Sequence, residues 1–182
     1  MKPILLFLAL LFSATTAFAD PLSGEKTVYL VTSSDERFAV ATINFQQTES
    51  GENYALDWNN DLFGEFFLSM RPFRCLEGPE RNWCYVPYPY ENPHRVTADD
   101  LTDLEYDLLF LWKKANDYGI TLWNGVYYKL EIDGDRIVGV MHDMDMNRMS
   151  APPPDGVLRP IRETDLYEAE KDRNWLPVVI IE

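Results

Sequence analysis

Short segments rich in β-branched and aromatic residues recur along most of this chain, and turn residues separate them. Three such segments lie close together near the start, at Thr27–Thr32, Arg37–Gln46 and Tyr54–Trp58. Segments of this length and composition are typical of β-strands, and the short polar stretches between them are typical of hairpin connections. This part of the chain is therefore predicted to form an antiparallel meander.

A second strand-rich region lies near the end of the chain. Asp133-Gly134 separates Val126–Ile132 from Arg136–Asp145, and an Asp-Gly pair between two such runs predicts a hairpin. Pro177–Ile181 is predicted to be a closing strand, because proline is tolerated at the first residue of a strand.

Two registers are open for the hairpin, and they place different side chains together. A two-residue loop puts Met141 beside Tyr128 and His142 on the opposite face. A three-residue loop with a bulge puts His142 and Met144 on the face of Tyr128. We favour the three-residue loop, because it gathers more apolar side chains on one face.

The stretch Thr97–Gly119 is the one long segment with a helical period. Its apolar residues recur at steps of three and four: Leu101, Leu104, Leu108, Leu111, Trp112 and Ala115. Thr97 with Asp100 is similar to a capping box, and Gly119 can end a helix. The stretch is therefore predicted to be a single helix packed on the sheet, with Lys113 exposed to solvent.

Together these elements predict a mainly β (α+β) fold, a small antiparallel barrel or curved sheet of about eight strands with one long packed helix. Closing or covering a sheet removes exposed strand edges. Tyr85–Pro93 carries three prolines and is predicted to be an extended crossing on the surface.

The first 19 residues are typical of a cleaved secretory signal. Lys2 precedes an apolar run from Ile4 to Phe12, and small residues stand at Ala17 and Ala19. The run is too short to span a bilayer, so no stable membrane insertion is expected. Residues 20–182 are predicted to form a single globular domain. The favoured compartment is a bacterial periplasm.

The chain is strongly acidic, with 30 acidic and 16 basic residues and a formal net charge of −14. This charge repels nucleic acid and anionic membrane surfaces, and both are excluded as partners. It favours solubility, and it also fits a cationic partner.

Cys75 and Cys84 are the two cysteines of the chain and flank the turn residues Gly78-Pro79. In an oxidising compartment this spacing predicts a disulfide across a hairpin or tight loop. The alternative is a redox or metal pair, but the spacing differs from the usual two-residue redox motif.

Residues 141–149 have the most unusual composition, with four of the six methionines and one of the two histidines. If the strand continues, His142, Met144 and Met146 project from one face. Thioether and imidazole groups are soft ligands that suit Cu(I) or Ag(I). The alternative is that these methionines only pack in the core.

The aromatic residues Trp83, Tyr85, Tyr88 and Tyr90 are a candidate platform for stacking a sugar or a proline-rich peptide. The alternative is that they pack the extended crossing against the barrel. The remaining tryptophans are expected in the core: Trp58, Trp112, Trp123 and Trp175.

Catalysis finds little support in the sequence. The chain lacks a G-x-S-x-G elbow, and both cysteines are assigned to the disulfide. His94, in a proline-rich segment, is expected to be a surface residue rather than a base.

Two resemblances bear on function. Ser50–Tyr54 (SGENY) is similar to the S-G-x-x-Y motif of periplasmic C-type lysozyme inhibitors, which implies that Ser50 enters the cleft of a cationic lysozyme. The chain is longer than that family and lacks its second, lysine-containing motif. Ser69–Gly78 (SMRPFRCLEG), with PYENP and TADDLTDLEYDLLF, resembles uncharacterised secreted proteobacterial proteins, a resemblance that implies no site residues.

The sequence thus predicts a secreted, non-enzymatic binding or interaction protein whose partner is a small ligand or a cationic protein. The alternatives are a periplasmic soft-metal protein, an inhibitor of a cationic lysozyme, and an enzyme whose site is not recognisable.

Overall fold

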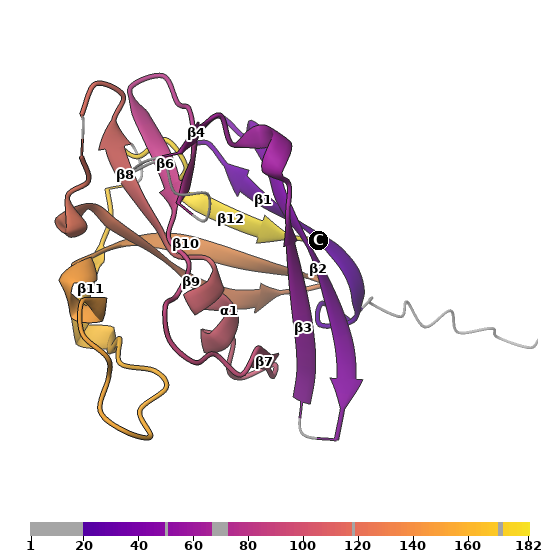
Figure 1. Cartoon of the computed structure of the whole chain (residues 1–182). Helices are drawn as coiled ribbons and strands as arrows, with labels where there is room; N and C mark the ends of the chain where they lie inside the picture. The colour runs from indigo at the N-terminus through magenta and orange to yellow at the C-terminus, as the bar shows by residue number, and fades with distance from the viewer. Residues whose placement is uncertain (1–19, 50, 67–72, 118, 171–172) are drawn as a thin grey trace, which may run out of the picture.

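The computed structural model describes residues 20–49, 51–66, 73–117, 119–170 and 173–182. The predicted secretory signal and Ser50 lie outside these ranges. Within them the chain forms one antiparallel sheet of twelve strands, more than the eight expected, with one short α-helix (Figure 1). The mainly β class is confirmed, while the strand count and the long helix are wrong.

The strands follow the order β4-β5-β6-β8-β9-β10-β12-β1-β2-β3-β7, and β11 pairs with β10. Their bounds are β1 Gly24–Val31, β2 Arg37–Thr48, β3 Gly51–Trp58, β4 Glu65–Phe66, β5 Arg74–Leu76, β6 Arg81–Tyr85, β7 Arg95–Val96, β8 Phe110–Lys114, β9 Gly125–Asp133, β10 Arg136–Met144, β11 Leu166–Glu168 and β12 Val178–Ile181. Short 3₁₀ helices lie at Asn60–Leu62 (η1), Leu122–Asn124 (η3), Met146–Met149 (η4) and Glu163–Asp165 (η5).

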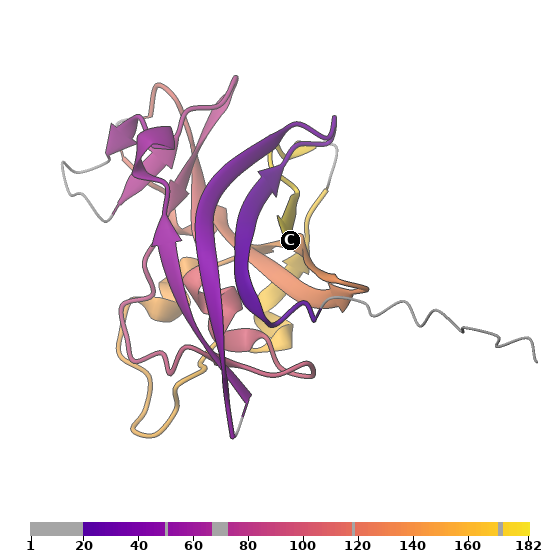
Figure 2. The ribbon, with the colours of Figure 1, turned by 90° about the vertical axis from the view of Figure 1, so that its right-hand side faces the viewer.

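The sheet curls into a half-barrel whose two ends, β4 and β7, are not paired with each other (Figure 2). The predicted meander is confirmed as β1, β2 and β3, which pair in sequence order. The predicted closing strand is also confirmed, because β12 lies between β1 and β10 and pairs with both.

The β9–β10 hairpin adopts the register that we did not favour. Asp133 pairs with Arg136, so the loop contains two residues, and Gly134 takes a φ of +67° at its first position. Tyr128 therefore lies opposite Met141, and His142 projects from the other face. A glycine at the first loop position allows the tight turn, so no bulge is needed.

The long helix predicted over Thr97–Gly119 is wrong, because the segment contains a turn, a short helix and a strand. Thr97 and Asp100 exchange backbone hydrogen bonds of 2.9 and 3.1 Å, which replaces the predicted capping box by a turn. Helix α1 covers only Thr102–Asp107. The chain then extends as β8, which pairs with β6 and β9.

The reason lies in four consecutive apolar residues, 108–111, that are all buried. Leu108 and Phe110 pack in one hydrophobic cluster, and Leu109 and Leu111 pack in another. A period of two that buries both faces is typical of a strand inside the fold, whereas a surface helix buries one stripe. Lys113, predicted to be exposed, is also buried, and its ammonium donates to the backbone oxygen of Asp117 at 3.3 Å.

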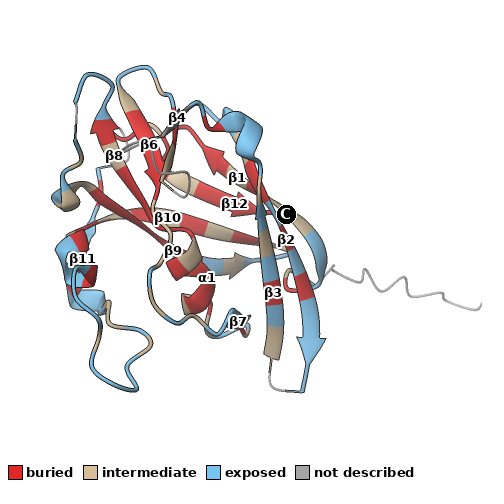
Figure 3. Cartoon of the chain, in the orientation of Figure 1, coloured by how far each residue is buried: buried red, intermediate tan, exposed pale blue. Residues whose placement is uncertain are grey.

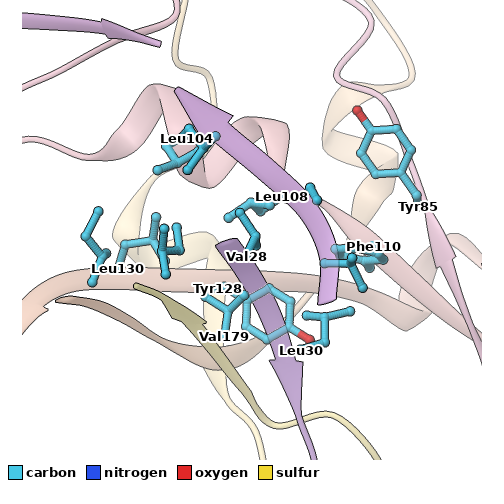
Figure 4. Packing of buried hydrophobic residues seen from close by; sticks show 14 of the residues in the cluster. Val28, Leu30, Tyr85, Leu104, Leu108, Phe110, Tyr128, Leu130 and Val179 are labelled. Atoms are coloured by element: carbon cyan, nitrogen blue, oxygen red, sulfur yellow. The ribbon is translucent and has the colours of Figure 1, made fainter. Parts of the chain in front are cut away.

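The buried side chains form two hydrophobic clusters, and Figure 3 shows buried segments along the strands and in α1. The first core fills the curl, and Figure 4 shows Leu104 and Leu108 directed from the α1 segment toward Val28 of β1. The second core contains the disulfide and the residues Tyr106, Leu109, Leu111, Tyr127, Met144, Met146 and Met149. The prediction that Trp123 lies in the core is wrong, because this residue is 70% exposed in η3.

The predicted disulfide between Cys75 and Cys84 is confirmed, and it joins directly paired residues of β5 and β6. Replacing both cysteines by alanine is expected to lower the free energy of unfolding by about 2.5 kcal/mol, because the reduced chain regains loop entropy. Urea unfolding of the variant, and of the wild type with and without reductant, measures this change. An unchanged midpoint would show that β5 and β6 are held by packing alone.

Candidate functional site

Aromatic rings join β3 to β6 across the half-barrel, and we call this contact the seam. Trp58, at the end of β3, packs against Tyr85, at the end of β6, with ring centroids 4.2 Å apart. A pocket of about 430 Å³ opens beside this contact. We call it the seam pocket, and its lining residues are Tyr54, Ala55, Leu56, Trp58, Tyr85, His94 and Asp107.

Three side chains from distant parts of the sequence form a polar chain in this pocket. The Tyr54 hydroxyl donates to Asp107 Oδ2 at 2.6 Å, and His94 Nε2 lies 3.4 Å from the same oxygen. The rings of Tyr54 and His94 contact edge to face, with centroids 5.6 Å apart. The Asp107 side chain is 15% exposed and the His94 side chain 54%, so the carboxylate forms the floor and the imidazole the rim.

The backbone around His94 is held in an uncommon conformation. His94 has a φ of +53°, and its carbonyl accepts a 3.1 Å hydrogen bond from the backbone N–H of Tyr54. Its own N–H donates to Asn92 Oδ1 at 3.3 Å. A left-handed conformation is uncommon for a residue with a β-carbon, so these contacts fix the imidazole against β3.

Burial controls the ionisation of the groups in the pocket. It raises the pKa of the Asp107 carboxyl above its usual value, although the Tyr54 hydroxyl and His94 act in the opposite direction. Burial, followed by the charge of Asp107, raises the pKa of Tyr85 to about 12 and that of Tyr54 further. Both phenols therefore stay protonated at neutral pH, and the Tyr54 hydroxyl donates to Asp107.

Arg74 of β5 lies against the aromatic side of the seam. Its guanidinium carbon lies 5.4 Å from the Trp58 ring centroid, 5.1 Å from that of Phe63 and 5.2 Å from that of Tyr85. Its Nε is buried without a hydrogen-bond partner among the described residues, and burial lowers the pKa of this group. The rings of the seam thus already hold an organic cation by cation–π contact.

The predicted aromatic platform is divided between different parts of the structure. Trp83 is fully buried and donates from Nε1 to the Tyr128 hydroxyl at 3.1 Å, so it has no face for a ligand. Tyr88 and Tyr90 pack against the second core, and their hydroxyls donate to the backbone oxygens of Leu158 and Met149. Of the four, Tyr85 lines the seam pocket.

The predicted soft-metal residues do not project from one continuous strand. β10 ends at Met144, and Met146 lies in η4. Both methionines are buried in the second core, while His142 is half-buried, with Nδ1 3.1 Å from the Val140 oxygen. The described residues hold no cluster of three or more His, Cys, Asp or Glu side chains placed to bind a metal. Binding of Cu(I) by these residues stays a prediction.

Sequence reasoning missed Tyr54, Trp58 and Asp107 as site residues. Tyr54 and Trp58 were correctly assigned to a strand, but their partners across the seam are more than 25 positions away in the sequence. Asp107 is the last residue of α1, and its place in the pocket follows from the tertiary fold. The sequence carries no local signal for this arrangement, because burial of the Asp107 carboxylate depends on the tertiary fold.

Comparisons with family models, curated proteins and solved structures return no match for this chain. In the described part of the chain, no helix has the length and apolar character needed to cross a membrane.

Proposed function

We propose that this chain is a secreted, non-enzymatic binding protein that holds a small ligand in the seam pocket, with the bacterial periplasm as its compartment. The observation that carries the proposal is the Tyr54–Asp107–His94 chain on one side of an open pocket with aromatic walls. A concave site with apolar walls and a few convergent polar groups is the usual form of a small-molecule site.

The composition of the pocket favours binding over catalysis. Its described lining residues include no serine or cysteine to act as a nucleophile, and both cysteines are joined in the disulfide. The secreted location rests on the predicted leader in residues 1–19, and it agrees with the disulfide, since such bonds persist in oxidising compartments.

A panel of small polar probes tests the proposal on ¹⁵N-labelled protein by NMR. The panel contains a monosaccharide, an amino acid, an amine and a carboxylic acid at millimolar concentration. At least one class is expected to give saturable shifts at the backbone amides of Tyr54–Trp58, Tyr85 and Asp107. Leu56→Trp, which enlarges a half-buried side chain on the same face of β3 as Tyr54 and Trp58, should remove these shifts. Saturable shifts elsewhere, or none, would overturn the proposal.

A side chain that serves binding often lowers the stability of the ligand-free protein, and this effect can be measured for Asp107. Burial raises the pKa of Asp107 in the folded state above its value in the unfolded state. The wild type therefore loses stability as the pH rises from the unfolded-state pKa through the folded-state pKa. Asp107→Asn removes the charge and keeps an oxygen that can accept from Tyr54. The variant is expected to be more stable at pH 7 by about 1 kcal/mol.

Thermal unfolding between pH 3 and pH 8 measures this difference, and about 1 kcal/mol corresponds to a rise of roughly 3 °C in Tm for a domain of this size. The gain should disappear at acidic pH, where Asp107 is protonated in both states. A loss of stability at pH 7 would instead show that the carboxylate serves the fold through its Tyr54 hydrogen bond.

A further inference from the structure

The buried carboxylates of the described chain follow a common pattern, because a basic side chain lies close to each. Asp103 is 2.6 Å from a guanidinium nitrogen of Arg159, and Asp165 is 2.9 Å from one of Arg148. Glu105 is 3.7 Å from the ammonium of Lys129. Such pairing is expected, since an isolated charge is expensive to bury.

Asp107 departs from this pattern. No lysine or arginine nitrogen of the described residues lies within 4 Å of its carboxylate, and its one charge-capable neighbour is the half-exposed His94. Asp103, on the same side of helix α1, adds a second negative charge nearby, whose effect opposes ionisation of Asp107. Asp107, which lines the seam pocket, thus has no permanent cation beside it among the described residues.

The other walls of the pocket also suit a positively charged ligand. Tyr54, Trp58 and Tyr85 present aromatic rings, and the faces of such rings attract cations. Trp58 and Tyr85 already contact the guanidinium of Arg74, which shows that their ring positions are compatible with this group. A carboxylate surrounded by aromatic rings is a good environment for an organic cation.

We infer that the ligand of the seam pocket carries an alkylammonium or guanidinium group, which sits on the Asp107 carboxylate between the rings of Tyr54, Trp58 and Tyr85. This inference rests on the proposed function and specifies the chemical class of the ligand. The ligand cation supplies to Asp107 what Arg159, Arg148 and Lys129 supply to the other buried carboxylates. The Tyr54 hydroxyl donates to Asp107 Oδ2 and so holds the carboxylate in place for the contact with the ligand cation.

Four probes of similar size and different charge test the inference: butylguanidinium, butylammonium, butyrate and butanol. Their binding is followed by NMR titration of the full chain at pH 7, using the amides of Tyr54–Trp58 and Asp107. The two cations are expected to bind at least tenfold more tightly than butyrate or butanol. Asp107→Asn should weaken the binding of both cations at least tenfold. Asp57→Asn, which removes the same charge at an exposed position of β3, is the matched control and should change their binding less than twofold.

The outcomes separate the inference from the proposed function. If butanol or butyrate binds at the seam pocket as tightly as the cations, the inference is overturned and the pocket remains a binding site. If the cations bind there and Asp107→Asn has no effect, the inference also fails. If none of the four probes shifts the pocket amides, the inference is overturned, and the proposed function depends on its own probe panel.

A fifth probe identifies the source of the cation. N-acetyl-arginine N-methylamide carries the guanidinium on a backbone unit with an amide on each side, as in a protein chain. Tighter binding than butylguanidinium supports the arginine of a protein partner as the ligand cation. Weaker binding supports a free small molecule.

Discussion

Leu104→Asp is expected to leave no folded protein under native conditions. Leu104 is fully buried in the first core, where it projects from α1 toward the strands (Figure 4). Loss of a buried leucine alone costs about 2 to 5 kcal/mol, and the charge adds a desolvation penalty of several kcal/mol. The sum is comparable to the whole stability of a typical domain, about 5 to 15 kcal/mol.

Circular dichroism and the dispersion of NMR amide signals measure this loss. Leu62→Asp is the matched control, because Leu62 in η1 is 37% exposed and the same change there should cost about 0.5 kcal/mol or less. Leu104→Met keeps the volume and should remain folded. A folded, cooperative Leu104→Asp protein would mean that α1 is not packed against the sheet as described.

Glu105→Ala is expected to lower the free energy of unfolding by about 3 kcal/mol or more, because it removes the acceptor of two buried donors. One carboxylate oxygen accepts from the Leu130 backbone N–H at 2.8 Å, and the other accepts from the Tyr127 hydroxyl. Both donors belong to β9, so the side chain connects α1 to this strand. Its loss leaves a strand N–H and a phenol without partners inside the protein.

Urea unfolding of Glu105→Ala measures the cost, and Glu163→Ala is the matched control. Glu163 also lies 3.7 Å from Lys129, but its side chain is 78% exposed. Removing it should change stability by less than about 0.5 kcal/mol, since surface ion pairs contribute little. Equal effects of the two substitutions would show that charge near Lys129, rather than the buried hydrogen bonds, is what matters.

The parts of the fold that depend on local pattern were predictable. The meander of β1 to β3, the β12 strand and the disulfide follow from strand composition, turn residues and cysteine spacing. Each signal lies within a few residues of the structure that it specifies. Local chemistry decides these elements before tertiary packing acts.

The segment around α1 could not be assigned in this way. Its leucines fit a helical stripe and a buried strand equally well, and the choice depends on two cores that form only in the tertiary structure. The hairpin register depended in the same way on which face is buried. The number of apolar side chains gathered on one face favoured the three-residue loop, while Gly134 allowed the tight two-residue turn that forms.

The candidate site was the least predictable part. Its residues come from β3, β6, the segment before β7 and the end of α1, and each one alone resembles an ordinary strand, loop or surface residue. Only the seam between β3 and β6 brings them together. A site assembled at the margin of a curled sheet leaves no spaced motif in the sequence.

The position of β12 has a consequence for the order in which the sheet closes. Residues 178–181 supply the strand that joins β1 to β10, so both neighbours remain open edges until this segment has docked. The half-barrel therefore cannot close from its amino-terminal strands alone. A chain truncated before β12 exposes two unpaired edges, and this truncation should give an aggregating product instead of a shortened but soluble one.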